Sequence, residues 1–243
     1  MDGISRTPPL SSSQKALALL EAIAEMPTAV GVSELARQVG SGRGTVHKQL
    51  VTLVSSGWVE QCEDGRYRLS MLATRVGNAA LEQASLGERV RPAMQRLADE
   101  CREAVSLSVL ERGTALIVQR VESEQVLNAD LKVGTRMPLA TSASGLVLTA
   151  FALPEERARL VGQGVALASD ERLDEVRRRE LAQSVDEYMV GIAAVAMPIQ
   201  NSQNRVVAAL SVAAPSIRMD LAGSEAALRT AQQIINQLVS GVK

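Results

Sequence analysis

The chain has 243 residues, of which 46% are hydrophobic and 22% charged, and its formal net charge is −1. This balance is that of a globular protein with a sizeable core in one large or two modest domains, and the net charge alone indicates no nucleic-acid partner. Two cysteines exclude a disulfide framework, and no apolar run reaches the roughly 20 residues of a membrane span. Because the N-terminus also lacks a signal-peptide pattern, we expect a cytoplasmic protein without membrane contact.

Hydrophobic spacing and helix-stop residues predict three helices after a disordered segment of residues 1–10. These helices cover residues 11–26, 33–39 and 43–56. We expect Ser11 or a neighbouring serine to cap the first helix and Ser33 to cap the second. A tight turn of residues 40–42 precedes the third helix, whose apolar spacing predicts an inner face of Val46, Leu50, Leu53 and Val54.

A β-hairpin follows, because Asp64-Gly65 lies between two short β-prone runs, residues 58–62 and 66–69. Helix, helix, three-residue turn, helix and hairpin is the order of a winged helix-turn-helix. We therefore assign residues 11–70 to a winged helix-turn-helix domain and residues 71–87 to a connecting helix. The connecting helix is predicted to turn its apolar side inward, with Leu72, Val76, Ala80 and Leu81.

The predicted third helix carries the residue types that DNA recognition needs. Residues 35–59 contain three cations and the single histidine but no acid, and small residues at the start of the helix permit close approach to a groove. A solvated helix face with incidental charge is the alternative for the helix, and charge protection of an edge strand is an equal alternative for the hairpin. The residues predicted to bind DNA are Ser41, Arg43, Gly44, Thr45, His47, Lys48, Arg66 and Arg68.

Residues 88–243 mix predicted helices and strands, which indicates an α+β domain. The helices cover residues 88–104, 141–152, 155–162, 169–183 and 222–239. The strands cover residues 105–110, 115–121, 126–133, 191–200 and 206–213. The sequence has no nucleophile elbow, P-loop or dinucleotide-binding motif, and its only histidine lies in the third helix, so we expect no enzyme, no metal site and no cofactor.

Small hydroxyl residues cluster where the predicted helix near residue 141 begins. A helix start exposes unpaired N–H groups and a positive dipole end, which suit a carboxylate, although plain N-capping is the alternative. The scarcity of aromatic residues favours a small aliphatic acid over a stacked ligand. The predicted effector-binding residues are Thr141, Ser142, Ala143, Ser144 and Gly145, with Ser211 and Ala213 on the opposite wall.

From about Ser13 to Leu238 the chain resembles the IclR family of bacterial transcription regulators. The segments that carry the resemblance are Gln14–Ile23, Val32–Gly40, Thr45–Leu50 with Leu53 and Gly57, Gly65–Leu69, Gly134–Gly145, Asp186–Pro198 and Ala209–Pro215. The resemblance implies a dimeric or tetrameric regulator whose GAF-like C-terminal domain, residues 88–243, binds a small and often acidic organic effector.

The sequence departs from the family pattern at four places. Ala140, Leu146 and Glu180 stand where the family usually has His, Lys and Gly, and Ala213-Ala-Pro215 replaces Ser-Gly-Pro. These departures predict a pocket with fewer polar groups than is typical of the family.

We therefore expect a ligand-responsive, sequence-specific transcription regulator of a metabolic or catabolic operon, more often a repressor than an activator. Its partners would be double-stranded operator DNA, an acidic effector, and a second copy in a homodimer or a dimer of dimers. The alternative is a metabolite-binding or catalytic α+β domain whose N-terminal module mediates protein contacts.

Overall fold

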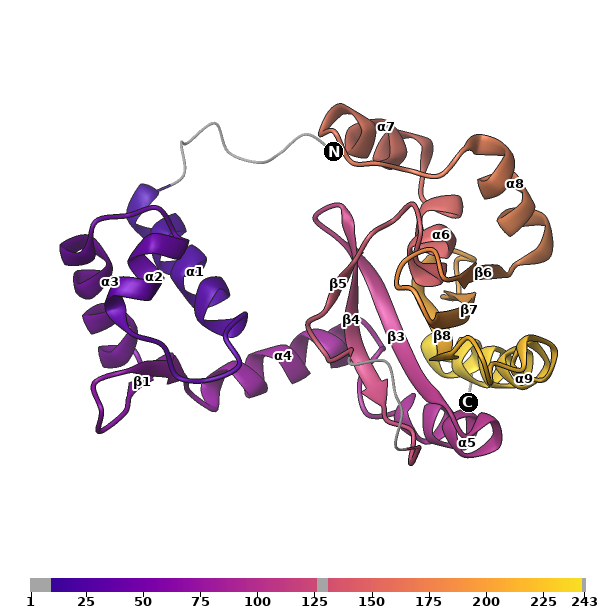
Figure 1. Cartoon of the computed structure of the whole chain (residues 1–243), viewed down its shortest axis with the longest axis horizontal. Helices are drawn as coiled ribbons and strands as arrows, with labels where there is room; N and C mark the ends of the chain where they lie inside the picture. The colour runs from indigo at the N-terminus through magenta and orange to yellow at the C-terminus, as the bar shows by residue number, and fades with distance from the viewer. Residues whose placement is uncertain (1–9, 126–130, 242–243) are drawn as a thin grey trace. The chain divides into compact units, whose positions relative to one another are not determined.

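The computed structural model describes residues 10–125 and 131–241, which divide into two compact units, Met1–Ala80 and Leu81–Lys243 (Figure 1). The disorder expected for residues 1–10 therefore falls, apart from Leu10, outside the described residues, as does most of the strand expected at 126–133.

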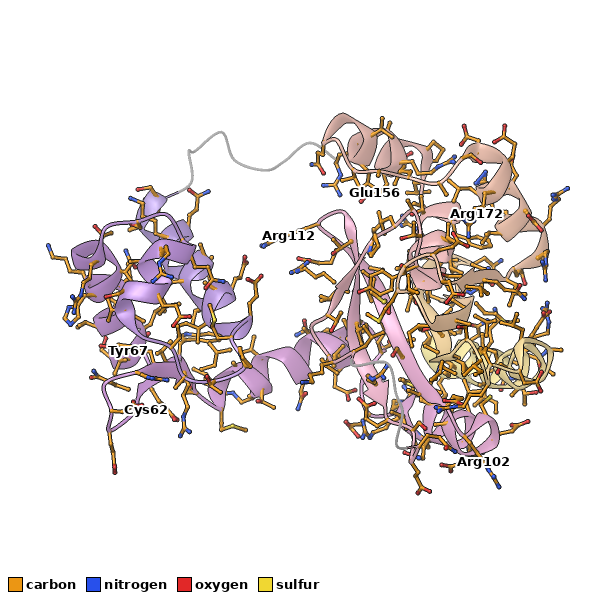
Figure 2. All side chains as sticks on the ribbon, in the orientation of Figure 1. Cys62, Tyr67, Arg102, Arg112, Glu156 and Arg172 are labelled. Carbon is orange, nitrogen blue, oxygen red and sulfur yellow. The ribbon has the colours of Figure 1, made fainter. Side chains whose placement is uncertain are left out.

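The first unit packs three helices against a short hairpin (Figure 1). Its elements are α1 (Ser11–Ala24), α2 (Val32–Gln38), α3 (Arg43–Ser55), β1 (Val59–Gln61), β2 (Tyr67–Leu69) and α4 (Leu72–Gln83), which crosses the unit boundary. Leu19, Leu35 and Leu50, one from each helix, are fully buried, because their spacing places one apolar side of each helix inward. Tyr67 of β2 is only 4% exposed and belongs to this core, so its side chain packs the hairpin against the helices (Figure 2).

Three expectations for this unit are wrong. The N-caps of α1 and α2 are Leu10 and Gly31, and neither helix receives a side-chain cap bond from a serine. Val54 is 38% exposed, because it lies one position beyond the buried i, i+4, i+7 stripe of α3. No residue of α4 is fully buried: Leu81 packs against the core of the second unit, whereas Val76 and Ala80, also expected inward, are exposed.

The second unit is built on an antiparallel six-stranded sheet in the order β5-β4-β3-β8-β7-β6 among the described residues. The strands are β3 (Ala104–Glu111), β4 (Thr114–Val121), β5 (Arg136–Met137), β6 (Ala182–Val185), β7 (Ile192–Gln200) and β8 (Val206–Pro215). The helices are α5 (Arg91–Cys101), α6 (Ala143–Ala150), α7 (Pro154–Gly162), α8 (Asp170–Arg179) and α9 (Leu221–Val239).

The sheet is covered on both faces, which gives the unit two apolar cores. The pair α5 and α9 packs on one face against Val105, Leu107 and Val212. The opposite face receives α6, with α8 beside it, against Ala196 and Ala209 (Figure 1). Because side chains alternate along a strand, successive residues of each strand face opposite helix layers.

Several boundaries in this unit differ by two or three residues from the sequence prediction, and two differences change the assignment of an element. Residues 131–133 form no strand, and the short β5 follows at Arg136 instead. The helix expected to reach residue 183 ends at Arg179, because Glu180 adopts a left-handed conformation at φ +51°, as glycine usually does after a helix. The chain then forms β6 at the sheet edge, a strand that was not predicted because the amphipathic helical pattern was extended through residue 183.

Candidate functional sites

The exposed side of α3 carries most of the residues predicted to bind DNA. Val46, Leu50 and Leu53 are buried in the core of the first unit, so the opposite side of the helix faces solvent. The predicted residues on that exposed side are Arg43, Gly44, Thr45, His47 and Lys48. Ser41, in the turn before α3, is half-buried beside them.

The cations of this surface are not engaged elsewhere. Within the described part of the chain, Arg43 and Lys48 form no ion pair, and the segment from residue 35 to residue 59 contains no acid. Their charges are thus available to a phosphate backbone, and neighbouring hydroxyl and imidazole groups can reach base edges.

The two arginines of the hairpin differ from those of α3, because both already have acidic partners. Arg68 Nη2 lies 3.0 Å from Glu60 Oε2 across the β1–β2 ladder, and Arg66 Nε lies 3.5 Å from Asp64 Oδ2 in the turn. About half or more of each of these side chains is exposed, so each pair contributes at most about 1 kcal/mol and a phosphate can compete for the arginine. These ion pairs are compatible with both alternatives for the hairpin, charge protection of an edge strand and contact with a DNA phosphate.

A cavity of about 30 Å³ lies in the second unit between the start of α6 and the face of the sheet. A single water molecule needs roughly 10–15 Å³ by this measure, so a ligand of several heavy atoms requires the wall to move. The cavity is lined by Ser106, Ile117, Leu131, Met137, Ser142, Ala143, Ser144, Ser184, Tyr188, Met189, Ile192, Ala194, Ser211 and Ala213.

Five of the seven predicted effector-binding residues line this cavity. They are Ser142, Ala143, Ser144, Ser211 and Ala213. The other two have other environments: the carbonyl of Thr141 accepts a hydrogen bond from Ser184, and Gly145 packs on backbone. A Cβ at Gly145 would lie 2.5 Å from the carbonyl oxygen of Pro138, so the missing side chain serves packing.

Sequence reasoning missed part of the wall. Ser106, Ser184, Tyr188 and Met189 line the cavity although no pattern singled them out. Ser106 alternates with apolar residues along β3, a signal that could have found it. Ser184 lies in β6, whose first two residues were assigned to the preceding helix and whose last two were assigned to no element. Serine hydroxyls are frequent along this wall, and the expectation of fewer polar groups than is typical of the family stays a prediction.

The start of α6 combines capping with free donors. Ser142 is the N-cap: its Oγ accepts from the backbone N–H of Gly145 at 3.1 Å and donates to the carbonyl of Pro138 at 2.6 Å. The backbone N–H groups of Ala143 and Ser144 form no hydrogen bond among the described residues, and neither does the Ser144 hydroxyl, although Ser144 is only 2% exposed. N-capping is therefore real here, and it leaves donors that a ligand oxygen can use.

The loop of residues 186–191, which carries Tyr188 and Met189, is fastened on two sides. Asp186 Oδ1 accepts from the N–H of Gly191 at 2.7 Å and from the hydroxyl of Ser216 at 3.1 Å. Arg172 of α8 donates to both carboxylate oxygens of Glu187, at 2.6 and 2.7 Å (Figure 2 labels Arg172). This hydrogen-bonded carboxylate raises the pKa of Arg172 above its ordinary value. A restrained loop therefore contributes Tyr188 and Met189 to the cavity wall.

Comparison with known proteins covers both units. Residues 12–63 match the model described as the IclR helix-turn-helix domain, and residues 78–238 match the bacterial transcriptional regulator IclR C-terminal model. The chain is 33% identical over 220 residues to the glycerol operon regulatory protein of Streptomyces griseus, which covers 86% of this chain and 87% of that protein. It is 28% identical over 224 residues to the acetate operon repressor of Salmonella typhimurium, covering 86% and 82% of the two chains.

Among solved structures, the chain is similar to an IclR homolog from Microbacterium hydrocarbonoxydans complexed with 4-hydroxybenzoate. The TM-score is 0.81 at 25% identity, with 95% of this chain and 100% of the other covered. Across residues 10–125 and 131–241, no helix is long and apolar enough to cross a membrane.

Proposed function

Because the chain belongs to the IclR family, and is thus a ligand-responsive, DNA-binding transcription regulator rather than an enzyme, we propose that it represses a metabolic operon. In this proposal, binding of a small acid changes the affinity of the protein for operator DNA. The resemblance found in the sequence is confirmed by these matches. One similar protein is named as an acetate operon repressor, which supports repression here. In this proposal the protein acts in the cytoplasm. Residues 11–70 bind DNA, residues 71–87 form the helix that connects the two domains, and residues 88–243 bind the effector.

The observation that carries the DNA contacts is the exposed and unpaired cationic side of α3. We place Arg43, Thr45, His47 and Lys48 in the major groove, with Ser41 and Gly44 at the point of closest approach. Arg66 and Arg68 of the hairpin would meet the flanking backbone, at the expense of their weak ion pairs.

Fluorescence anisotropy with DNA from upstream of the protein's own gene, repeated over a series of salt concentrations, tests this interface. Arg43→Ala should cost about 1–3 kcal/mol if Arg43 reads a base, and Lys48→Ala should weaken binding to all sequences and lower the salt slope by about 1. Arg96→Ala, which removes an arginine that is also exposed but lies on α5, is the control. Unchanged binding by both α3 variants would refute the interface, and absence of salt-dependent DNA binding would favour a protein-contact module.

The exposed apolar residues of α4 support a homodimer or a dimer of dimers. The helix is amphipathic, but its apolar residues are not buried: Val76 is 46% exposed, and neither Leu72 nor Ala80 is buried. A single helix-turn-helix reads few base pairs, so a second copy would supply the missing specificity. Light scattering at micromolar concentration should show at least a dimer for the wild type and a shift toward monomer for Val76→Lys. A monomeric wild type, with and without DNA, would contradict the proposal.

For the effector, we propose that a small organic acid places a carboxylate oxygen at the start of α6. The free N–H groups of Ala143 and Ser144 and the Ser144 hydroxyl support this position. Since the similar Microbacterium structure holds 4-hydroxybenzoate, acids are an appropriate panel. Calorimetry should find an acid that shifts operator affinity by about 1–3 kcal/mol. If Ser144→Leu leaves the affinity for that acid unchanged, the effector binds elsewhere.

A further inference from the structure

A buried guanidinium lies beside Ser106, in one wall of the proposed effector cavity. Arg120 of β4 pairs in register with Ser106 of β3, and its side chain is only 2% exposed. Arg120 Nη1 donates to Ser106 Oγ at 2.9 Å, while Arg120 Nε donates to Glu122 Oε1 at 2.7 Å. Ser106 lines the cavity, so Arg120 can influence a ligand there through the Ser106 hydroxyl.

The contact with Arg120 determines the polarity of Ser106. A guanidinium can only donate hydrogen bonds, so Ser106 Oγ must accept from it, and the hydroxyl hydrogen remains for another acceptor. Among the described residues, Ser106 Oγ donates to no carbonyl or carboxylate. Glu122 balances the charge of Arg120. The cavity is therefore presented with the O–H donor of Ser106 rather than with a net positive charge.

Other serines of the wall have the opposite polarity, because their hydroxyl hydrogens are already used. Ser184 Oγ donates to the carbonyl of Thr141 at 2.6 Å, and Ser211 Oγ donates to the carbonyl of Ser106 at 3.4 Å. While these contacts are kept, each oxygen offers only lone pairs to a ligand, and the contact of Ser211, at 3.4 Å, is the longer and weaker of the two.

Sheet register brings a donor and an acceptor together. Ser106 and Ser211 are direct partners on β3 and β8, and both line the cavity, so their side chains share one face about 4.5–5.5 Å apart at Cβ. Ser144 adds a second, uncommitted hydroxyl from the opposite side of the cavity. A matching ligand must therefore carry an acceptor oxygen for Ser106 and Ser144 next to a hydroxyl that donates to Ser211.

We propose that the effector is a small 2-hydroxy carboxylate, and that Arg120 is a positioning residue that holds Ser106 as a donor to its carboxylate. The inference rests on the proposed effector site and adds the ligand class. A 2-oxo acid presents a carbonyl, which has no hydrogen to donate, to the acceptor Ser211, and an unsubstituted acid leaves that acceptor unpaired. The narrow cavity favours two- and three-carbon acids, which need the least movement of the wall.

The test is calorimetry of the full chain with glycolate, both lactate enantiomers and glycerate, against pyruvate, propionate and glycerol. At least one hydroxy acid should bind about tenfold more tightly than its oxo and unsubstituted counterparts, the effect expected for one hydrogen bond lost at a buried polar group. Ser106→Ala should lose about tenfold in affinity for that hydroxy acid, and Ser106→Thr, which keeps the hydroxyl, should restore it.

Ser108→Ala is the matched control, because Ser108 is fully buried two residues along the same strand and does not line the cavity. This variant should bind the acid as the wild type does. For Arg120, the expected readout is selectivity: Arg120→Leu should lose the preference for hydroxy over oxo acids, while Arg120→Gln, which can still donate to Ser106, should keep more of it. Operator binding without acid shows that each variant is folded.

Three results would overturn the inference: equal affinity for lactate and pyruvate, wild-type affinity in Ser106→Ala, or no hydroxy acid bound at millimolar concentration. The first two leave the proposed effector site standing if Ser144→Leu still abolishes binding. If no acid of any class binds or shifts operator affinity, the proposed function of the site fails as well.

Discussion

Gly145 and Gly77 are two helical glycines for which the structure predicts opposite effects of the same substitution. At Gly145, in the first turn of α6, a Cβ would lie 2.5 Å from the carbonyl oxygen of Pro138 and 2.6 Å from Leu139 Cα. Both are backbone atoms, which cannot rotate away as a flexible side chain would. At Gly77, in α4, a Cβ would meet nothing within 4 Å.

The magnitudes follow from these surroundings. Overpacking against backbone costs about 3 kcal/mol, and loss of the Ser142 cap on Gly145 adds about 1, while the better helix propensity of alanine returns about 1. Gly145→Ala should thus lower the free energy of unfolding of the second unit by about 3 kcal/mol. Gly77→Ala should raise the stability of its helix by about 0.5–1 kcal/mol.

Scanning calorimetry on the full chain measures both effects. A domain of this size shifts its melting temperature by roughly 2–4 °C per kcal/mol, so Gly145→Ala should lower the transition of the second unit by about 6–12 °C. Gly77→Ala should not lower any transition. If Gly145→Ala melts with or above the wild type, the close approach of α6 to Pro138 and Leu139 is not the reason for glycine there, and ligand approach becomes the better explanation.

Three further predictions concern the second unit. Thr149→Val should raise the free energy of unfolding by about 1 kcal/mol, because Thr149 Oγ1 is fully buried without a hydrogen bond among the described residues; denaturant titration measures this, and a loss of stability would contradict it. Glu180→Gly should stabilise by about 0.5–1 kcal/mol by relieving the left-handed conformation at φ +51°, and an unchanged midpoint in the same titration would show that no strain is stored there. Arg172→Ala should release Glu187 and speed amide hydrogen exchange in residues 186–191, measured by mass spectrometry; unchanged exchange would show that Asp186 alone restrains the loop.

Most of the fold follows from local sequence patterns, and the misplaced boundaries have physical causes. Helices with strong apolar spacing, such as α3 and α9, begin and end within a residue or two of the prediction. The helix predicted through residue 183 failed at Glu180, because a glutamate in a left-handed conformation carries none of the usual helix-stop signal. Serine caps failed at α1 and α2, since each helix starts one or two residues earlier, after Leu10 and Gly31.

The wall of the cavity was only partly predictable, because it is assembled by sheet register. Local sequence located the start of α6, where small hydroxyl residues precede an apolar helix. It could not show that Ser106 and Ser211, 105 positions apart along the chain, are partners on neighbouring strands. It also could not show the polarity of each hydroxyl, which depends on whether a carbonyl or Arg120 lies nearest.

The same contacts that shape the cavity connect it to the rest of the second unit. Ser142 and Gly145 bind the start of α6 to Pro138, and Ser184 binds β6 to Thr141 just before that helix. Arg172 joins the loop over the cavity to α8, which packs against α6. A ligand too large for the narrow cavity must therefore displace the loop or shift α6 and α8 together. Since a ligand shifts an equilibrium only by its differential affinity for two states, the coupling to operator binding is limited by how much better the ligand fits the displaced arrangement than the present one.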